Sequence, residues 1–310
     1  MSLLIVGTVA YDELITPFGE SGKILGGSAT YASYSAKNFI DKVDIVSIVG
    51  DDFPSTQLED FRNNGISTEG IEVVEGGKTF FWKGKYHNDM NTRDTLDTQL
   101  NVLADFEPKV PENMQNAEYL MLGNLTPAVQ MSVLKQMKRR PKLVLLDTMN
   151  FWMENTLDEL LQVLREVDVL AINDEEARQL SGEYSLVKAA AKILNMGPRY
   201  LVIKKGEHGA LLFDRNEVFF APALPLEEVF DPTGAGDTFA GGFMGYLAHT
   251  HDTDFENMKR AVIYGSALAS FCVEKFGTER ISAISRSEMH DRVMEFIGLT
   301  QFEITLGSPA

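Results

Sequence analysis

The chain has 310 residues, and its composition, 44% hydrophobic and 24% charged, supplies enough apolar material for a sizeable core and excludes a disordered protein. Its 45 Asp and Glu outnumber its 28 Lys and Arg, and the resulting formal charge of −17 argues against nucleic acid and anionic membranes as partners. Its single cysteine, Cys272, excludes an intrachain disulfide, and no signal peptide or long apolar segment is evident, so we expect a cytoplasmic protein.

Short apolar runs alternate with segments of helical periodicity along most of the chain. The runs predict buried strands and the periodic segments predict helices. The predicted strands are 3–6, 43–49, 143–146, 167–172, 200–203 and 210–213, and the predicted helices are 29–39, 157–165, 175–180, 186–196, 238–248, 255–273 and 287–297. Such an alternation predicts an α/β protein with a central, mainly parallel sheet that helices cover on both faces.

The pattern changes over residues 72–102. An aromatic stretch that alternates loosely, from Thr79 to Tyr86, is followed by a polar stretch rich in Asp, Thr and Asn. We predict a strand-rich excursion from the main sheet. It could be a solvated loop with one hairpin or a lid that closes over a bound substrate, and its aromatic residues favour the lid.

The most informative segment runs from Asp231 to Phe243, where a Gly-rich turn leads directly into an apolar helix. The N–H groups at the start of such a helix have no intrahelical partner, and they could hold a phosphoryl group. Asp237 falls in the first turn, where an acidic residue most often serves only to stabilise the helix start. The spacing matches neither the G-x-G-x-x-G dinucleotide fingerprint nor the P-loop.

Three further segments are weaker signals. Asp12 and the pair Gly26-Gly27 lie near the sheet edge at which open α/β proteins bind ligands, although a turn and an ordinary loop Asp would look the same. Asn173 and Glu176 have the spacing of a helix capping box, which is their simplest explanation. Residues 204–209 connect two predicted strands, most simply as a tight turn with a solvated Lys pair.

Taken in order, these segments resemble the motif series of the PfkB or ribokinase-like family of carbohydrate and nucleoside kinases, over nearly the whole chain. The matching segments are Asp12, Gly26-Gly27, Asn173-x-x-Glu176, Lys205-Gly206-x-x-Gly209 and Asp231-x-Thr233-Gly234-Ala235-Gly236-Asp237. The last resembles the family's C-terminal signature, D-T-x-G-A-G-D. The resemblance implies a ribokinase-like α/β fold in a single domain over 1–310, with a small β-rich lid over 72–102 to which residues 12–24 could contribute.

The resemblance also implies a role for each matching residue. Asp237 would be the general base, and the amides of Gly234, Ala235 and Gly236 would form the anion hole. The substrate would contact Asp12, Gly26, Gly27 and Tyr31, and the nucleotide would contact Asn173, Glu176, Lys205, Gly206, Gly209 and Gly277. Glu176 would help to hold Mg²⁺ through water, and Asp231 and Thr233 would bind a monovalent cation such as K⁺.

Two departures from the family pattern bear on the acceptor. Tyr31 stands where ribokinases and adenosine kinases usually have Asn, and Trp152 stands where ketosugar kinases have Arg, which argues against ribose itself and against acidic sugars. Tyr31 and the aromatic residues 80–82 could stack on a nucleobase, although packing is the commoner role of such side chains. We therefore expect an ATP- and Mg²⁺-dependent kinase that phosphorylates a hydroxymethyl group of a small sugar or a nucleoside.

The sequence is also compatible with two other functions and with one assembly. A non-catalytic regulator of the same fold, which binds nucleotide or sugar, is the main alternative, and the presence of Asp237 argues against it. A nicotinamide-dependent oxidoreductase shares the sheet architecture but is disfavoured by the missing fingerprint. The resemblance further implies that the lid could pair two chains into a homodimer.

Overall fold

The computed structural model describes residues 2–303, and its framework is a nine-stranded sheet in the order β13-β12-β11-β10-β9-β8-β1-β4-β5. The strands are β1 (Leu3–Val6), β4 (Val43–Gly50), β5 (Ile66–Val74), β8 (Tyr119–Leu122), β9 (Leu143–Asp147), β10 (Val169–Asn173), β11 (Tyr200–Lys204), β12 (Ala210–Phe213) and β13 (Val218–Ala221). The pairs from β5 through β11 are parallel, whereas β12 and β13 are antiparallel. The predicted mainly parallel sheet is confirmed.

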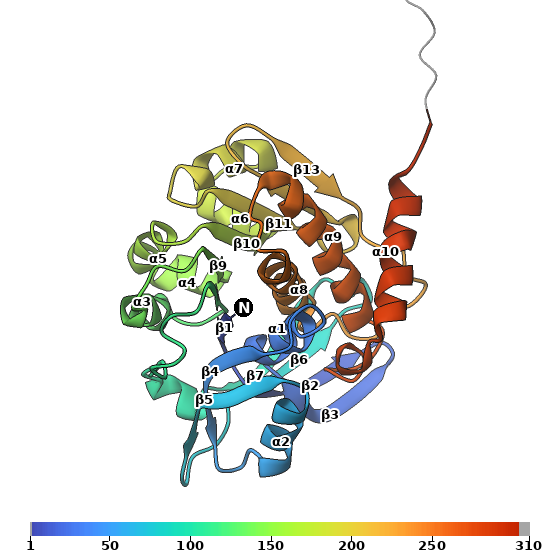
Figure 1. Cartoon of the computed structure of the whole chain (residues 1–310). Coiled ribbons are helices and arrows are strands. Elements are labelled where there is room, and N and C mark those ends of the chain that lie inside the picture. The colour runs from blue at the N-terminus through green and yellow to red at the C-terminus, as the bar shows by residue number, and fades with distance from the viewer. Residues whose placement is uncertain (1, 304–310) are drawn as a thin grey trace, which may run out of the picture.

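Helices cover both faces of this sheet. Successive side chains of each strand point to opposite faces, and each face forms its own apolar core with the helices that cover it. On β1, Leu3 and Ile5 enter one apolar cluster while Leu4 and Val6 enter the other. The first cluster includes residues of α1 (Ser28–Ala36), α2 (Ser55–Asn63), α8 (Ala235–Thr250) and α9 (Phe255–Cys272), and the second includes residues of α3 (Pro127–Gln136), α4 (Asn150–Asn155), α5 (Leu157–Leu164), α6 (Asp174–Ser181) and α7 (Leu186–Leu194). Figure 1 shows the two layers on either side of the sheet.

The C-terminal helix α10 (Arg286–Thr300) packs along α9 at the outside of the first layer. Short 3₁₀ turns lie at η1 (Asn101–Asp105), η2 (Gly206–His208) and η3 (Ile281–Ala283). Among the residues described, no helix is long and apolar enough to cross a membrane.

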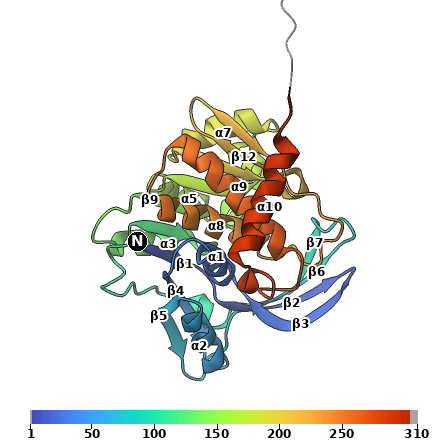
Figure 2. The same cartoon turned by 45° about the vertical axis from the view of Figure 1, so that its right-hand side comes forward.

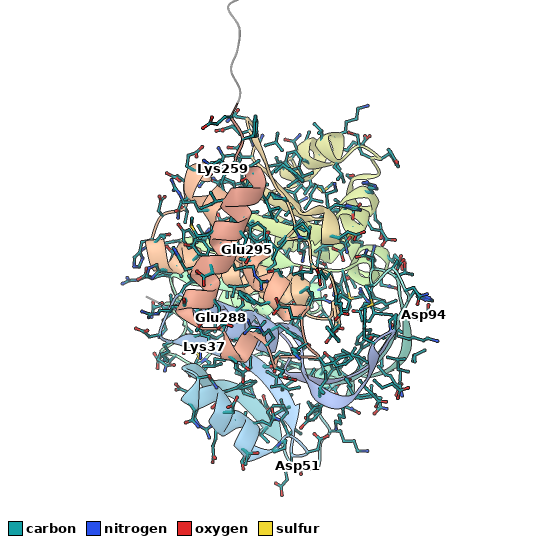
Figure 3. The ribbon with its side chains drawn as sticks, turned by 90° about the vertical axis from the view of Figure 1, so that its right-hand side faces the viewer. Lys37, Asp51, Asp94, Lys259, Glu288 and Glu295 are labelled. Carbon is teal, nitrogen blue, oxygen red and sulfur yellow. The ribbon has the colours of Figure 1, made fainter. Side chains whose placement is uncertain are left out.

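A second sheet of four strands, which we call the lid, lies beside the main sheet in the order β3-β2-β6-β7. Its strands are β2 (Ala10–Thr16), β3 (Gly19–Gly26), β6 (Phe81–Tyr86) and β7 (Arg93–Gln99). The hairpin β2-β3 pairs with the hairpin β6-β7 through a parallel β2-β6 contact, so segments far apart in sequence form one sheet (Figure 2). Strand β7 is exposed along its whole length, and its Asp94 lies at the outer side of the lid in Figure 3.

Candidate active site

The carboxyl ends of three neighbouring strands bring together side chains that are distant in sequence. Asp147, Asn173 and Lys204 are the last residues of β9, β10 and β11, which lie side by side and run parallel. Asn173 pairs with Lys204 in register, and Lys204 Nζ lies 3.1 Å from Asp147 Oδ1. This edge is where open α/β sheets bind their ligands.

The N-terminus of α8, the predicted anion hole, faces the same edge. Gly234 caps the helix with φ +74°, and a Cβ atom there would lie 2.4 Å from the ring of Tyr31, so only glycine fits. Of the three amides predicted to form the anion hole, that of Ala235 donates to the Pro232 carbonyl, whereas those of Gly234 and Gly236 donate to no acceptor among the described residues. The free amides of Gly234 and Gly236, with the positive end of the helix dipole, favour a bound anion.

Asp237 projects from the first turn of α8 into this charged edge. Burial, followed by the charge of Asp147, raises the pKa of its carboxyl to about 7, while Lys204 and Arg93 of the lid act in the opposite direction. A carboxyl with a pKa near neutrality is partly ionised at physiological pH and is matched to proton transfer.

Asp231 holds two loops together beneath the anion hole. Its side chain is fully buried, and it accepts hydrogen bonds from the amide of Thr233 at 2.8 Å and from the amide of Gly277 at 2.9 Å. Burial raises its pKa to about 6, although both amides stabilise the ionised form. Asp231 thereby brings Gly277 from the C-terminal part of the chain to the start of α8.

Asp12 lies on the lid side of the site, opposite the anion hole. It is 5% exposed, and burial, followed by the charges of Asp231 and Asp237, raises its pKa to about 8. Its carboxylate fills the space that a side chain at position 26 would need, since a Cβ atom on Gly26 would lie 1.9 Å from Oδ2. Asp12, Gly26 and Gly27, predicted to contact the substrate, are therefore neighbours.

Asn173 and Glu176 form the capping box that their spacing suggests. The Glu176 amide donates to Asn173 Oδ1 and the Asn173 amide donates to Glu176 Oε2, both at 2.8 Å. Burial raises the pKa of Glu176 to about 7, a rise that Lys204 opposes. Among the described hydrogen bonds, Glu176 Oε1 accepts none, so it could still bind a hydrated cation.

A cavity of about 460 Å³ extends from the anion hole along α8 and α9, and its walls are partly apolar. Its lining includes Lys204, Gly206, Gly209, Ala235, Gly236, Phe239, Ser266, Ser270 and, from the tip of the lid, Asp89 to Asn91. Gly206 and Gly209 were predicted to contact the nucleotide, and both line this cavity. Lys205 does not line it: its neighbour Lys204 does, because side chains alternate at the end of strand β11.

The lid contacts the anion hole directly. Thr233 Oγ1 donates to Tyr86 Oη at 3.0 Å, and Tyr86 is buried on β6. Trp82 lies on the same side of β6, next to Asp12 on β2, so both belong to the lid face that looks into the site. A Cβ atom on Gly84 would lie 2.2 Å from the Trp82 ring, so the indole occupies the space over that glycine, and it remains partly exposed.

Tyr31 does not occupy the position that stacking on a nucleobase requires. Its ring lies behind Gly234 and is 1% exposed, because α1 packs closely against α8. Its phenol group supports the anion hole from behind, and no ring face is open to a ligand. The three aromatic residues proposed for stacking, Phe80, Phe81 and Trp82, are all partly exposed. Phe81 also packs against the first core cluster, whereas Trp82 lies beside Asp12 on the lid.

Comparison with known proteins is consistent with this geometry. The family model described as pfkB family carbohydrate kinase matches residues 6–284. A cytidine kinase from Thermococcus kodakarensis is 32% identical over 254 residues, which are 79% of this chain and 88% of that protein.

Solved structures extend the comparison to the fold. A nucleoside kinase from Burkholderia thailandensis in complex with inosine has a TM-score of 0.75 at 19% identity and covers 96% of this chain and 99% of its own. An aminoimidazole riboside kinase from Salmonella enterica, complexed with aminoimidazole riboside and an ATP analog, has a TM-score of 0.73 at 18% identity, covering 94% and 100%. A ribokinase from Thermotoga maritima has a TM-score of 0.76 at 21% identity, covering 95% of this chain and 99% of its own, and the predicted ribokinase-like fold is confirmed. The chain therefore belongs to the pfkB family of carbohydrate kinases.

Proposed function

We propose that this kinase transfers the γ-phosphate of ATP to a hydroxymethyl group of a nucleoside, with Asp237 as the general base. The observation that most supports the proposal is the position of Asp237, whose carboxyl lies in the first turn of α8 beside free amides and opposite Lys204. The cytidine kinase at 32% identity supports a nucleoside over a free sugar.

The proposed reaction joins the two sides of the site. The acceptor hydroxyl gives its proton to Asp237 as its oxygen forms a bond to the γ-phosphorus, and the bond from that phosphorus to the β,γ-bridging oxygen breaks. The amides at the start of α8 would stabilise the charge that develops on the transferring group. Asp12 would accept hydrogen bonds from acceptor hydroxyls at the lid side.

Two cations are part of the proposal. Mg²⁺ supplies charge neutralisation of the nucleotide phosphates, and Glu176 fits it through water because one of its carboxylate oxygens is free of described hydrogen bonds. Within the described residues, no group of three or more acidic, His or Cys side chains is arranged to hold a metal ion, which agrees with a metal held mainly by nucleotide and water. A monovalent cation at Asp231 and Thr233 remains a prediction.

Trp82 supports a nucleoside acceptor. It is partly exposed on the lid face beside Asp12, and Thr95 Oγ1 accepts a hydrogen bond from its Nε1 at 3.3 Å. An indole held in this way offers a surface on which a planar base could stack while Asp12 binds the ribose hydroxyls.

The test is a screen for ADP release with Mg·ATP against nucleosides, pentoses, hexoses and inositols, with Asp237→Asn as the blank. A nucleoside as the best acceptor supports the proposal. A free sugar as the best acceptor contradicts the proposed acceptor class. Silence across the panel while ATP still binds would favour the non-catalytic regulator.

A homodimer through the lid is proposed alongside the activity. Strand β7 forms the outer edge of the lid, all of its side chains are exposed, and its Leu96 is 50% exposed. An uncovered strand edge is prone to pair with another chain. Sedimentation of the wild type against a Leu96→Lys variant tests this: loss of a dimer in the variant supports it, and a monomeric wild type contradicts it.

A further inference from the structure

Lys204 places a positive charge inside a site whose surroundings are strongly acidic. It is the last residue of β11, its side chain is 18% exposed, and its Nζ is ion-paired with Asp147. Among the described residues that line the cavity, it is the only Lys or Arg. The chain as a whole has a net charge of −17, which repels anions, and this ammonium group supplies a positive charge at the place where the phosphoryl group is proposed to bind.

The ammonium group lies directly against the anion hole. A Cβ atom built on Gly236 would be 3.0 Å from Lys204 Nζ, so the ammonium group occupies the space beside the Cα atom of Gly236, in the first turn of α8. Burial alone would lower the pKa of Lys204, but the carboxylates of Asp147, Glu176 and Asp237 raise it above its usual value. The group is therefore cationic at neutral pH and stands beside the free amides at the start of α8.

Lys204 has unused hydrogen-bonding capacity. An ammonium group has three N–H donors, and the described hydrogen bonds use one of them, toward Asp147 Oδ1. A purely structural pair in so buried a place would be expected to satisfy the remaining donors within the protein. The cavity lies on the open side of the group, so the remaining donors can reach a ligand there.

We propose that Lys204 is a catalytic residue that binds the γ-phosphoryl group during transfer, and that Asp147 is a positioning residue that holds the ammonium group in front of Gly236. This inference rests on the phosphoryl transfer proposed above. Lys204 keeps its proton throughout. The acceptor proton goes to Asp237, the acceptor oxygen forms a bond to the γ-phosphorus, and the bond from that phosphorus to the β,γ-bridging oxygen breaks, so that ADP leaves. The ammonium group stabilises the charge on the transferring phosphoryl oxygens.

The neighbouring lysine provides a matched control. Lys204→Met should lower kcat by roughly 10² to 10³-fold with a smaller change in KM for the acceptor, because the lost contact is strongest in the transition state. Lys205→Met removes the same charge one residue away, outside the cavity, and should stay within about twofold of the wild type. Turnover in Lys204→Met equal to that of Lys205→Met would overturn the proposal.

A second set of variants guards against misfolding and tests the role of Asp147. Lys204→Met leaves Asp147 without its partner, whereas Lys204→Met with Asp147→Asn removes both charges and should fold. Asp147→Asn alone should lower kcat by roughly tenfold and should have no further effect in the Lys204→Met background, as expected for residues that act through one contact. An equal loss in both backgrounds would contradict positioning through Lys204.

Nucleotide binding without an acceptor separates this proposal from the proposed function. By calorimetry, Lys204→Met should weaken binding of a nonhydrolysable ATP analogue roughly tenfold more than binding of ADP, since only the former has a γ-phosphoryl group. That selective loss supports the contact even if no acceptor in the screen is phosphorylated. If Lys204→Met weakens binding of both nucleotides equally while the wild type turns over, the proposed role of Lys204 is refuted and the proposed function stands.

Discussion

The main-sheet side and the lid side of the site are built in different ways. On the main-sheet side, Asp147, Asn173 and Lys204 end strands whose preceding residues are completely buried, and the Gly234 cap is supported by the buried ring of Tyr31. On the lid side, β7 is exposed throughout and Trp82 is only partly covered. The groups that transfer the phosphoryl group thus lie on the buried frame, and those that would recognise the acceptor lie on the exposed lid. This division would let related proteins change their acceptor while the chemistry stays the same.

The largest expected effect concerns the rigid side. Gly234→Ala forces a side chain into the ring of Tyr31 and into a positive φ, so the free amides should move and turnover should fall by roughly 10²-fold. Gly182→Ala is the matched control, since Gly182 has φ +68° with nothing within 4 Å of an added Cβ atom. Steady-state kinetics should show normal turnover for the control, and equal losses in both variants would show that backbone strain alone accounts for the effect.

The next effect is the pH dependence of kcat/KM for the acceptor. Asp237 must be ionised to accept a proton, and its pKa is raised to about 7, so activity should rise with pH through neutrality. Between pH 8 and pH 6 the loss should be roughly tenfold. A profile that is flat down to pH 5 would mean that a group other than Asp237 accepts the proton, or that chemistry does not limit the rate.

The smallest effect is expected on the lid. Trp82→Leu should raise KM for a nucleoside roughly three- to tenfold through the lost stacking surface and leave KM for ATP unchanged. Phe81→Leu is the neighbouring control, because Phe81 packs against the first core cluster and should affect thermal stability more than acceptor binding. If KM for the acceptor responds equally to both variants, Trp82 has no special role at the site.

Most of the main sheet was predictable where burial leaves a continuous apolar run, although the four-residue buried strand β8 was missed. Strands such as β1, β4 and β10 are buried on both faces, and their sequences predict them directly. Strand β5 was missed because it lies at the edge of the sheet and mixes polar with apolar residues, and β13, at the opposite edge, exposes alternate side chains. The continuous apolar run that marks a buried strand is lost where the strand meets solvent on one side.

The site was predictable only where one local motif contains the chemistry. The segment from Asp231 to Asp237 is contiguous, so its turn, its free amides and its acidic first turn could be foreseen. The Lys204–Asp147 pair joins residues 57 positions apart, and local sequence favours a solvated Lys pair. A rule that polar residues at the ends of parallel strands share one edge would have identified both residues. The burial of Tyr31 depends on the packing of α1 against α8, which no local pattern reveals.

The most direct test of the central claim is the turnover of Asp237→Asn with Mg·ATP and the best acceptor from the screen, measured together with its affinity for ATP. The account predicts that kcat falls by roughly 10² to 10⁴-fold while ATP affinity and thermal stability stay close to those of the wild type, because the variant loses only the base. Wild-type turnover in Asp237→Asn would contradict the account and remove Asp237 from the reaction.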